Sequence, residues 1–264
     1  MSGFLVINPR SGKGTSAEEL RVEAERLGIE THVLALDDDP GEIARAAPAG
    51  ALGMAGGDGS LAPVAQVAIE EDKPFVVVPF GTRNHFARDL GLDRDDPLGA
   101  LQAFLGGHER GVDVGRVNGR IFLNNVSLGI YAQLVDRRER HRRRHDALAQ
   151  LRALAILLRR PAPLGVSIDG RPAEARVVLV ANNHYQLDLF SLGARERLDE
   201  GLLYLYVAAE LLPTTWEERT GGHFVVDAQA GRLQAAVDGE PEDLATPLRF
   251  EIEPAGLRVL VPPS

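Results

Sequence analysis

The chain has 264 residues, of which 44% are hydrophobic, so it can form one large domain or two ordinary ones with a real core. A formal net charge of −9 at pH 7 argues against electrostatic binding to nucleic acid. The absence of cysteine excludes disulfides, thiolate metal sites and cysteine nucleophiles, and it fits a reducing compartment.

The N-terminal residues lead almost directly into an apolar run, Phe4–Ile7, that predicts a buried strand. They carry no basic region and no cleavage-site pattern, so we expect no signal peptide. No apolar run approaches the length of about 18 residues that a membrane-spanning helix requires. We therefore expect a cytoplasmic protein that is at most peripheral on the inner face of the membrane.

The first part of the chain alternates strand and helix signals. A loop of turn residues, Asn8–Gly14, follows the first strand, and Ser16 and Glu19 have the spacing of a capping box at the start of a helix. A second strand is expected over Thr31–Leu36. The dipeptide Asp39-Pro40 then supplies a cap residue and a first-turn proline for a second helix.

The alternation continues to about residue 105. The expected elements are a strand over 51–55, a helix from about Ser60 to Glu71, a strand over 75–78, a short helix ending near Leu90, and a helix over 96–105. This order implies a doubly wound parallel sheet with helices on its faces.

Polar, glycine-bearing loops follow Ile7, Ala55 and Val78, and we expect them to converge, because ligands bind beyond the carboxyl ends of parallel strands. In the stretch Gly56–Ser60, the glycines would let a ligand approach the backbone closely. The free N–H groups at the start of the following helix would attract phosphate. Asp58 lies where a phosphate or its metal would bind. The alternative is a tight strand-to-helix turn with no ligand.

Two other nucleotide motifs fit this sequence poorly. Residues Gly12–Ala17 match the dinucleotide pattern G-x-G-x-x-A, but the glycines come too late after the strand. A Walker A loop would require glycine at position 7, which is Ile7. His141 and His145 have i, i+4 spacing but lie among arginines, so surface histidines are favoured over metal ligands.

From about Gly111 onwards, short strand patterns and turn dipeptides favour a β-sandwich. Asn118-Gly119 predicts a type I′ hairpin, and Asp169-Gly170 predicts a second hairpin between strands over 165–168 and 177–181. Further strands are expected over 202–207, 224–229, 233–237, 248–252 and 257–261. The domain boundary is expected near Gly106-Gly107, which gives domains 1–107 and 108–264.

A basic helical insert is expected over about 132–160. The segment Arg137–Arg160 is rich in arginine and contains only two acidic residues, Glu139 and Asp146. Its leucines supply an apolar component. Such a segment is typical of a helix that lies on an anionic lipid surface. The alternative is a solvated arginine-rich helix packed through its leucines.

The tripeptide Asp238-Gly239-Glu240 follows the strand over 233–237 and by itself indicates a hairpin turn. With it, the sequence contains four short motifs in a fixed order: Asn8–Gly12, Gly56–Ser60, Pro79–Arg88 and Val237–Glu240. Together they resemble the diacylglycerol kinase catalytic-domain family, which includes bacterial lipid kinases and the sphingosine and ceramide kinases. The segment Leu198–Leu203 is similar to the acidic turn of that family.

The resemblance implies a nucleotide-binding α/β domain related to NAD kinase and phosphofructokinase, followed by a β-sandwich. It also implies ATP-dependent phosphorylation of a lipid hydroxyl, such as that of diacylglycerol, in a cleft between the domains. ATP and Mg²⁺ are the implied cofactors, and a lipid is the implied partner. The oligomeric state stays open, with a dimer among the allowed states.

The resemblance also assigns roles to residues. Asp58 would hold Mg²⁺ or orient the γ-phosphate, Glu240 would be the general base, and Asp238 would support it or reach the metal. Glu200 would be a ligand of a structural Mg²⁺. The nucleotide would be held by loop residues Asn8, Pro9, Ser11, Gly12, Lys13, Gly56, Gly57, Asp58, Gly59, Ser60, Gly81, Thr82 and Asn84.

The chain departs from the family pattern at Ala62-Pro63, at His85 and at Glu200. Two alternatives therefore stay open beside the lipid kinase. One is a non-catalytic lipid- or nucleotide-binding protein on the kinase scaffold. The other is a kinase of a soluble substrate, similar to NAD kinase.

Overall fold

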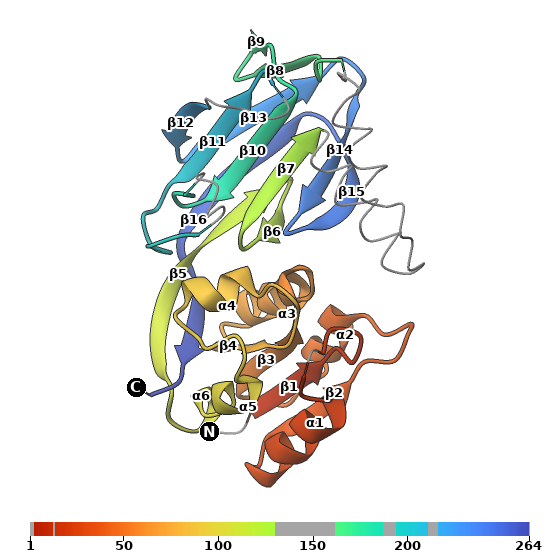
Figure 1. The fold of residues 1–264 in the computed structure, drawn as a ribbon, viewed down its shortest axis with the longest axis vertical. Coiled ribbons are helices and arrows are strands. Elements are labelled where there is room, and N and C mark those ends of the chain that lie inside the picture. The colour runs from red at the N-terminus through yellow and green to blue at the C-terminus, as the bar shows by residue number, and fades with distance from the viewer. Residues whose placement is uncertain (1–2, 13, 130–161, 187–193, 211–215, 264) are drawn as a thin grey trace. The chain divides into compact units, whose positions relative to one another are not determined.

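The computed structural model describes residues 3–12, 14–129, 162–186, 194–210 and 216–263 (Figure 1). It divides into two compact units: unit 1 comprises Met1–Val114, Tyr185–Glu200 and Glu253–Ser264, and unit 2 comprises Gly115–His184 and Gly201–Ile252. The expected boundary near Gly106-Gly107 thus lies inside unit 1. Two later segments also return to unit 1, which a linear reading of composition and periodicity does not show.

Unit 1 is built on parallel strands. They are β1 (Gly3–Ile7), β2 (Glu30–Val33), β3 (Ala51–Gly56), β4 (Phe75–Pro79) and the end of β16 (Leu248–Val261), in the order β2-β1-β3-β4-β16. Neighbouring strands in this order are parallel, so the predicted parallel sheet is confirmed.

One strand was expected to be two. The segments 248–252 and 257–261 belong to the single long strand β16, which pairs with β13 (His223–Ala228) in unit 2 and with β4 in unit 1. Ala255 has a positive φ of 51°, and its N–H bonds to the carboxylate of Asp113 instead of continuing a regular ladder. The polar stretch around Ala255 is therefore a local irregularity within an extended chain, although it resembles a turn in sequence.

The helices of unit 1 begin largely where their caps predict. Ser16 and Glu19 form the complete capping box of α1 (Ala17–Arg26), and Asp39 caps α2 (Pro40–Arg45). The others are α3 (Asp58–Glu70), α4 (His85–Asp89), α5 (Pro97–Ala100) and α6 (Ala103–Gly106). The helix expected over 96–105 is thus divided into two short ones.

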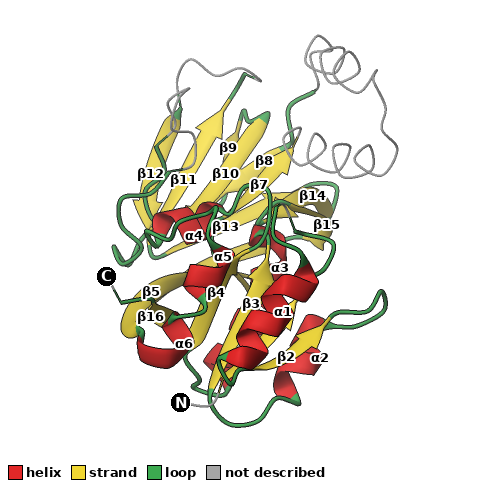
Figure 2. Ribbon diagram, turned by 60° about the horizontal axis from the view of Figure 1, so that its bottom comes forward, coloured by secondary structure: helices red, strands yellow, loops and turns green. Residues whose placement is uncertain are grey.

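Helices cover both faces of the parallel sheet (Figure 2). Leu5 and Ile7 of β1 pack in one cluster with Leu20 of α1 and Phe104 of α6. Contacts of α2 with β1 and α3, and of α3 with β3, occupy the other face. Burial on both sides explains why the strands read as continuous apolar runs with little alternation.

Unit 2 contains a six-stranded antiparallel sheet in the order β12-β11-β10-β7-β14-β15. Its strands are β7 (Asn125–Gly129), β10 (Val177–Asn182), β11 (Leu203–Ala208), β12 (Glu217–Gly221), β14 (Arg232–Val237) and β15 (Glu240–Ala245). The second layer is formed by the end of β5 (His108–Val117), β6 (Arg120–Phe122), β8 (Val166–Ile168), β9 (Arg171–Ala173), β13 and the first part of β16.

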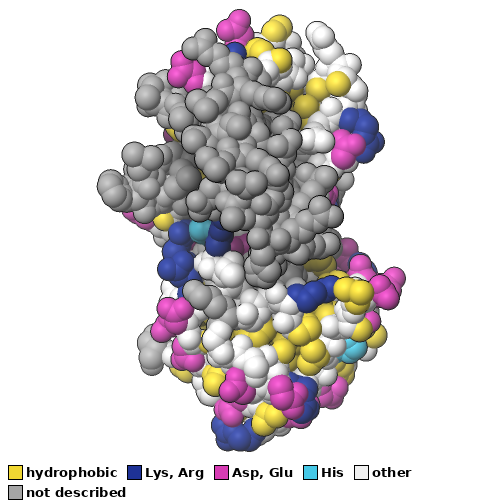
Figure 3. Space-filling model, turned by 45° about the vertical axis from the view of Figure 1, so that its right-hand side comes forward, with side chains coloured by type: hydrophobic (Ala, Val, Ile, Leu, Met, Phe, Trp, Pro, Cys, Tyr) yellow, Lys and Arg dark blue, Asp and Glu magenta, His cyan; other side chains and the backbone are white. Residues whose placement is uncertain are grey.

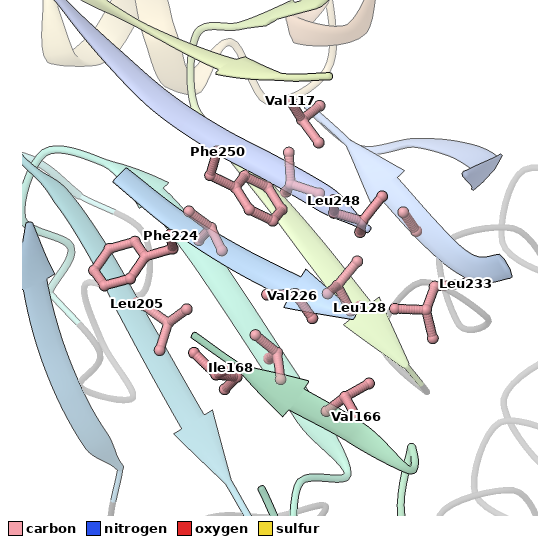
Figure 4. Packing of buried hydrophobic residues seen from close by; sticks show 14 of the residues in the cluster. Val117, Leu128, Val166, Ile168, Leu205, Phe224, Val226, Leu233, Leu248 and Phe250 are labelled. Carbon is pink, nitrogen blue, oxygen red and sulfur yellow. The ribbon is translucent and has the colours of Figure 1, made fainter. Parts of the chain in front are cut away.

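The two layers of unit 2 enclose a continuous apolar core (Figure 4). Leu128 and Leu205 come from the six-stranded sheet, and Val226 and Phe250 come from the second layer. Alternate residues of the strands supply this core, as in β13, where every second side chain is buried. The predicted β-sandwich is thereby confirmed.

Three hairpins of unit 2 turn on dipeptides whose two residues both have positive φ. The values are 49° and 84° for Asn118-Gly119, 49° and 75° for Asp169-Gly170, and 49° and 88° for Asp238-Gly239. Positive φ at both central residues is the signature of type I′ turns. Asp169-Gly170 joins β8 to the short strand β9, whereas the strand expected as its partner is β10 in the other sheet.

Two predicted features lie outside the described residues: Lys13 and the basic insert over 132–160 with Arg137–Arg160. Within the described part of the chain, no helix is long and apolar enough to cross a membrane. On the face of unit 1 in the lower part of Figure 3, side chains of both charges are interspersed with apolar ones.

Candidate active site

The loops of interest leave the parallel sheet where its strand order reverses. The sheet runs from β1 to β2 on one side and to β3 on the other, and in such folds the crevice beyond these strand ends is the usual ligand site. The N–H of Asn8 donates to the carbonyl of Ala55 at 2.9 Å. This bond holds the start of the first loop against the end of β3.

The glycine loop leads into α3 earlier than expected. Gly57 is the N-cap and Asp58 is the first helical residue, whereas the sequence predicts a start near Ser60. The N–H and the hydroxyl of Ser60 both donate to the carbonyl of Gly57, at 2.9 and 2.7 Å. A hydroxyl has one proton, so in this rotamer Ser60 cannot also donate to a phosphate. Backbone N–H groups at the start of a helix are the other donors that a phosphate could use.

Glycine is required where the loops approach one another. A Cβ atom on Gly81 would lie 2.5 Å from Cα of Gly57, and one on Gly12 would lie 2.7 Å from the ring of Phe80. Neither approach is open to a larger residue without displacement of backbone or a buried ring. The three loops that follow β1, β3 and β4 are therefore in mutual contact, as the strand order predicts.

Asp58 ties the second loop to the third. Its Oδ2 accepts the N–H of His85 at 3.0 Å, and its Oδ1 accepts the N–H of Phe86 at 2.9 Å. The carboxylate thus caps α4 from a different loop. The N-cap residue Asn84 is in the left-handed region (φ 50°, ψ 50°) and makes no side-chain cap bond of its own.

Asn84 holds the third loop closed. Its Oδ1 accepts the N–H of Gly81 at 2.9 Å and its Nδ2 donates to the carbonyl of Gly81 at 3.0 Å, and the residue is buried. Its amide is therefore engaged within the turn, whereas Thr82 in the same loop is exposed. Of the two side chains predicted to contact nucleotide, Thr82 is the one at the surface.

A polar pocket of about 260 Å³ adjoins the third loop. It is lined by residues 79–84 together with Arg94, Asp95 and Pro97. Arg94 donates from Nη1 to the carbonyl of Arg83 at 3.2 Å, which joins the two sides of the pocket. Two arginines in its wall favour an anionic ligand.

His85 is the first residue of α4, and its ring is only partly exposed. Burial lowers the pKa of His85, with smaller contributions from Arg88 and Arg83, while Asp58 and Asp89 act in the opposite direction. Its Nδ1 is buried without a hydrogen-bond partner among the described residues. In the sequence, His85 is a departure from the family pattern at a position where a histidine could contact phosphate directly.

The acidic turn near Glu200 belongs to unit 1. Asp199 pairs with Arg197 at 3.0 Å, and this hydrogen bond lowers the pKa of Asp199. Asp113 donates its N–H to the carbonyl of Leu198 at 2.7 Å. Among the described residues, no group of three or more histidine or acidic side chains could hold a metal ion. Glu200 as a ligand of a structural Mg²⁺ stays a prediction, and we derive no step through such an ion.

Asp58 is the other residue that is predicted to bind Mg²⁺. This ion is usually bound by one or two carboxylates together with substrate phosphates and water, so it needs no cluster of acidic residues. Asp58 presents one carboxylate beside the glycine loop, and its oxygens Oδ2 and Oδ1 accept the N–H groups of His85 and Phe86.

The second set of predicted catalytic residues lies in unit 2. Asp238 is buried, and its carboxylate accepts the N–H groups of Leu123, Asn124 and Asn125 at 2.8, 2.7 and 3.1 Å. Glu240 is exposed and begins β15 directly after the turn. Asp238 therefore fixes the hairpin that presents Glu240. That Glu240 meets the loops of unit 1 stays a prediction.

One buried cluster had no sequence signal. Nε of Arg195 donates to Oδ2 of Asp89 at 2.7 Å, and Arg88 pairs with the other oxygen at 2.7 Å. The guanidinium also lies over the rings of Phe86 and Tyr185, at 5.8 and 5.4 Å. The cluster fixes the residues around Arg195 against α4, the helix that follows the third loop.

The fold combines an α/β unit with a β-sandwich unit, and three glycine-bearing loops follow parallel strands of the α/β unit. Residues 2–117 match the family model of the diacylglycerol kinase catalytic domain, the family that the sequence motifs resemble.

Named relatives agree. A diacylglycerol kinase of Bacillus subtilis is 30% identical over 197 residues, which are 66% of this chain and 62% of that protein. One of Staphylococcus aureus strain JH9 is 35% identical over 140 residues, covering 49% and 44%. The matched part thus spans less than two thirds of each relative.

Solved structures share the fold. One described as a diacylglycerol kinase from Bacillus anthracis strain Sterne has a TM-score of 0.70 at 21% identity and covers 99% of this chain and 97% of its own. A second chain from the same strain has a TM-score of 0.72 at 19% identity. At 21% and 19% identity, this similarity supports the fold alone.

Proposed function

We propose that this protein is an ATP-dependent lipid kinase that transfers the γ-phosphate to a hydroxyl of a lipid such as diacylglycerol. The observation that carries the proposal is the mutual contact of three glycine-bearing loops at the reversal point of the parallel sheet. The names of the relatives support the same class of reaction. Phosphoryl transfer depends mainly on positioning and charge stabilisation, which loops of this kind provide.

In the proposed reaction, the first-turn N–H groups of α3 bind phosphate oxygens, and Asp58 positions the third loop and the phosphate-bound Mg²⁺. The ion would neutralise charge on the phosphates. The lipid oxygen forms a bond to the γ-phosphorus as the bond to the leaving ADP breaks. Glu240 accepts the proton of the lipid hydroxyl, a contribution of about 10²–10⁴-fold for a positioned base.

The test compares Glu240→Gln with Glu218→Gln, a substitution at an exposed glutamate of β12. With ATP and diacylglycerol vesicles, Glu240→Gln should lower kcat by about 10²–10⁴-fold and leave the KM for ATP unchanged. Glu218→Gln should behave like the wild type. Full activity of Glu240→Gln refutes the assigned base.

The acceptor is tested in the same assay. Phosphorylation of NAD in place of lipid would favour a soluble-substrate kinase. ATP binding without turnover on any acceptor would favour a non-catalytic protein on the kinase scaffold.

We further propose that the segment Arg137–Arg160 holds the enzyme on anionic lipid, as its arginines and leucines suggest. Replacement of Arg142, Arg143 and Arg144 by Glu should reduce co-sedimentation with anionic liposomes. Unchanged binding would rule this contact out.

A further inference from the structure

The ring of His85 lies beside two of the proposed nucleotide loops. The backbone N–H of His85 donates to Oδ2 of Asp58 at 3.0 Å, and Asp58 is the first residue of the helix after the glycine loop. Asp58 and Arg83 are among the charged residues that act on the imidazole, and Arg83 belongs to the third loop. The ring is therefore placed where the second and third loops meet.

The two ring nitrogens of His85 differ in their surroundings. Only Nδ1 is fully covered while lacking a hydrogen-bond partner among the described residues. A proton on Nδ1 would be a buried donor with no acceptor, at a cost of about 1–3 kcal/mol. With the proton on Nε2, Nδ1 is instead a buried acceptor, and this is the tautomer that a ligand with only acceptor oxygens at Nε2 selects. The polar group that His85 can offer to a ligand is thus the Nε2–H.

Resting on the proposed function, we propose that His85 binds a phosphate oxygen of the nucleotide through Nε2–H. Phosphate oxygens are acceptors only, and the ring supplies a donor that stays fixed because its other nitrogen is buried. In this site Ser60 donates its one hydroxyl proton to Gly57, and the buried amide of Asn84 is held to Gly81 through both its oxygen and its nitrogen. The Nε2–H of His85 is a further donor at the start of α4.

The experiment uses two amides of different length, because they reproduce different ring nitrogens. Glutamine at position 85 places an amide N–H near the position of Nε2, whereas asparagine reaches only the position of Nδ1. His85→Gln should bind ATP within about threefold of wild type by calorimetry. His85→Asn and His85→Phe should bind ATP about tenfold more weakly, as expected for loss of one hydrogen bond to a charged acceptor.

Adenosine, which lacks phosphate, should bind equally to all variants. His108→Asn, at an exposed histidine of β5, is the matched control and should bind ATP like the wild type. Thermal denaturation without ligand separates folding from binding. His85→Phe removes the unpaired nitrogen, so it should be at least as stable as wild type while still binding ATP weakly.

ATP binding by His85→Phe that equals wild type would overturn the proposal and leave the kinase function standing. Equal losses in His85→Gln and His85→Asn would overturn it as well, since the donor position would then be irrelevant. Failure of the wild type to bind ATP at all would overturn both the inference and the proposed function.

Discussion

Nε of Arg195 and Oδ2 of Asp89 are 2.7 Å apart, and their side chains are 0% and 1% exposed. Removal of Arg195 would leave Oδ2 of the buried Asp89 without this donor, while Arg88 still pairs with Oδ1. We expect Arg195→Met to lower the free energy of unfolding by about 1–3 kcal/mol in urea denaturation.

The matched control is Arg232→Ala, which breaks an equally short ion pair with Asp243 whose side chains are 57% and 56% exposed. An exposed pair contributes only about 0–1 kcal/mol. If both variants lose the same stability, burial of the Arg195–Asp89 pair has no energetic weight.

Gly81→Ala should disturb the contact between the second and third loops. The added Cβ would lie 2.5 Å from Cα of Gly57 and 2.7 Å from Oδ1 of Asn84, so a loop must move. We expect a loss of about 1–3 kcal/mol of stability and clearly weaker ATP binding by calorimetry. Gly106→Ala is the control, because open space surrounds its added methyl group. Wild-type ATP affinity in Gly81→Ala would count against the proposed nucleotide loops.

Asp238→Asn should show whether Asp238 stabilises the hairpin, as distinct from the proposed catalytic role of Glu240. An amide retains one acceptor oxygen, so at least one of the backbone N–H groups of Leu123, Asn124 and Asn125 loses its partner. We expect a loss of about 2–4 kcal/mol in chemical denaturation. Glu240→Gln, two residues away at an exposed position, should denature like the wild type. An unaltered unfolding curve for Asp238→Asn would contradict the supporting role.

His85 should titrate below the ordinary pKa of histidine in an NMR titration, because burial disfavours its charged form. Its neutral form is then favoured in the folded state, and the unfolded chain takes up the proton first as the pH falls. The contribution of His85 to stability is therefore complete above the unfolded pKa and is lost as the pH falls from there to the folded pKa. A His85 midpoint above about 6.5 would contradict this direction.

The features predicted well from sequence depend on neighbours within a few residues. The capping box of Ser16 and Glu19, the Asp39-Pro40 start and the Asn118-Gly119 turn each carry their own stereochemistry. The parallel order of strands also follows from local alternation and short connections. These signals place the three loops at one edge of the sheet.

The interactions that build the site are not local. Asp58 and His85 are 27 residues apart, Asp89 and Arg195 are 106 apart, and Leu123 and Asp238 are 115 apart. No periodicity or turn pattern links such pairs in a single sequence. The sequence therefore identifies Asp58 and Asp238 as candidate functional carboxylates. That both accept backbone N–H groups of distant segments is visible only in the structure.

The pairing of Val259 and Leu260 of β16 with Phe75 and Val76 of β4 limits where this protein can be divided. The family match ends at residue 117, before this strand begins. A fragment truncated there would leave one side of β4 with unsatisfied N–H and C=O groups, and bare sheet edges of this kind recruit other chains. We therefore expect a fragment that ends at residue 117 to aggregate rather than to fold on its own.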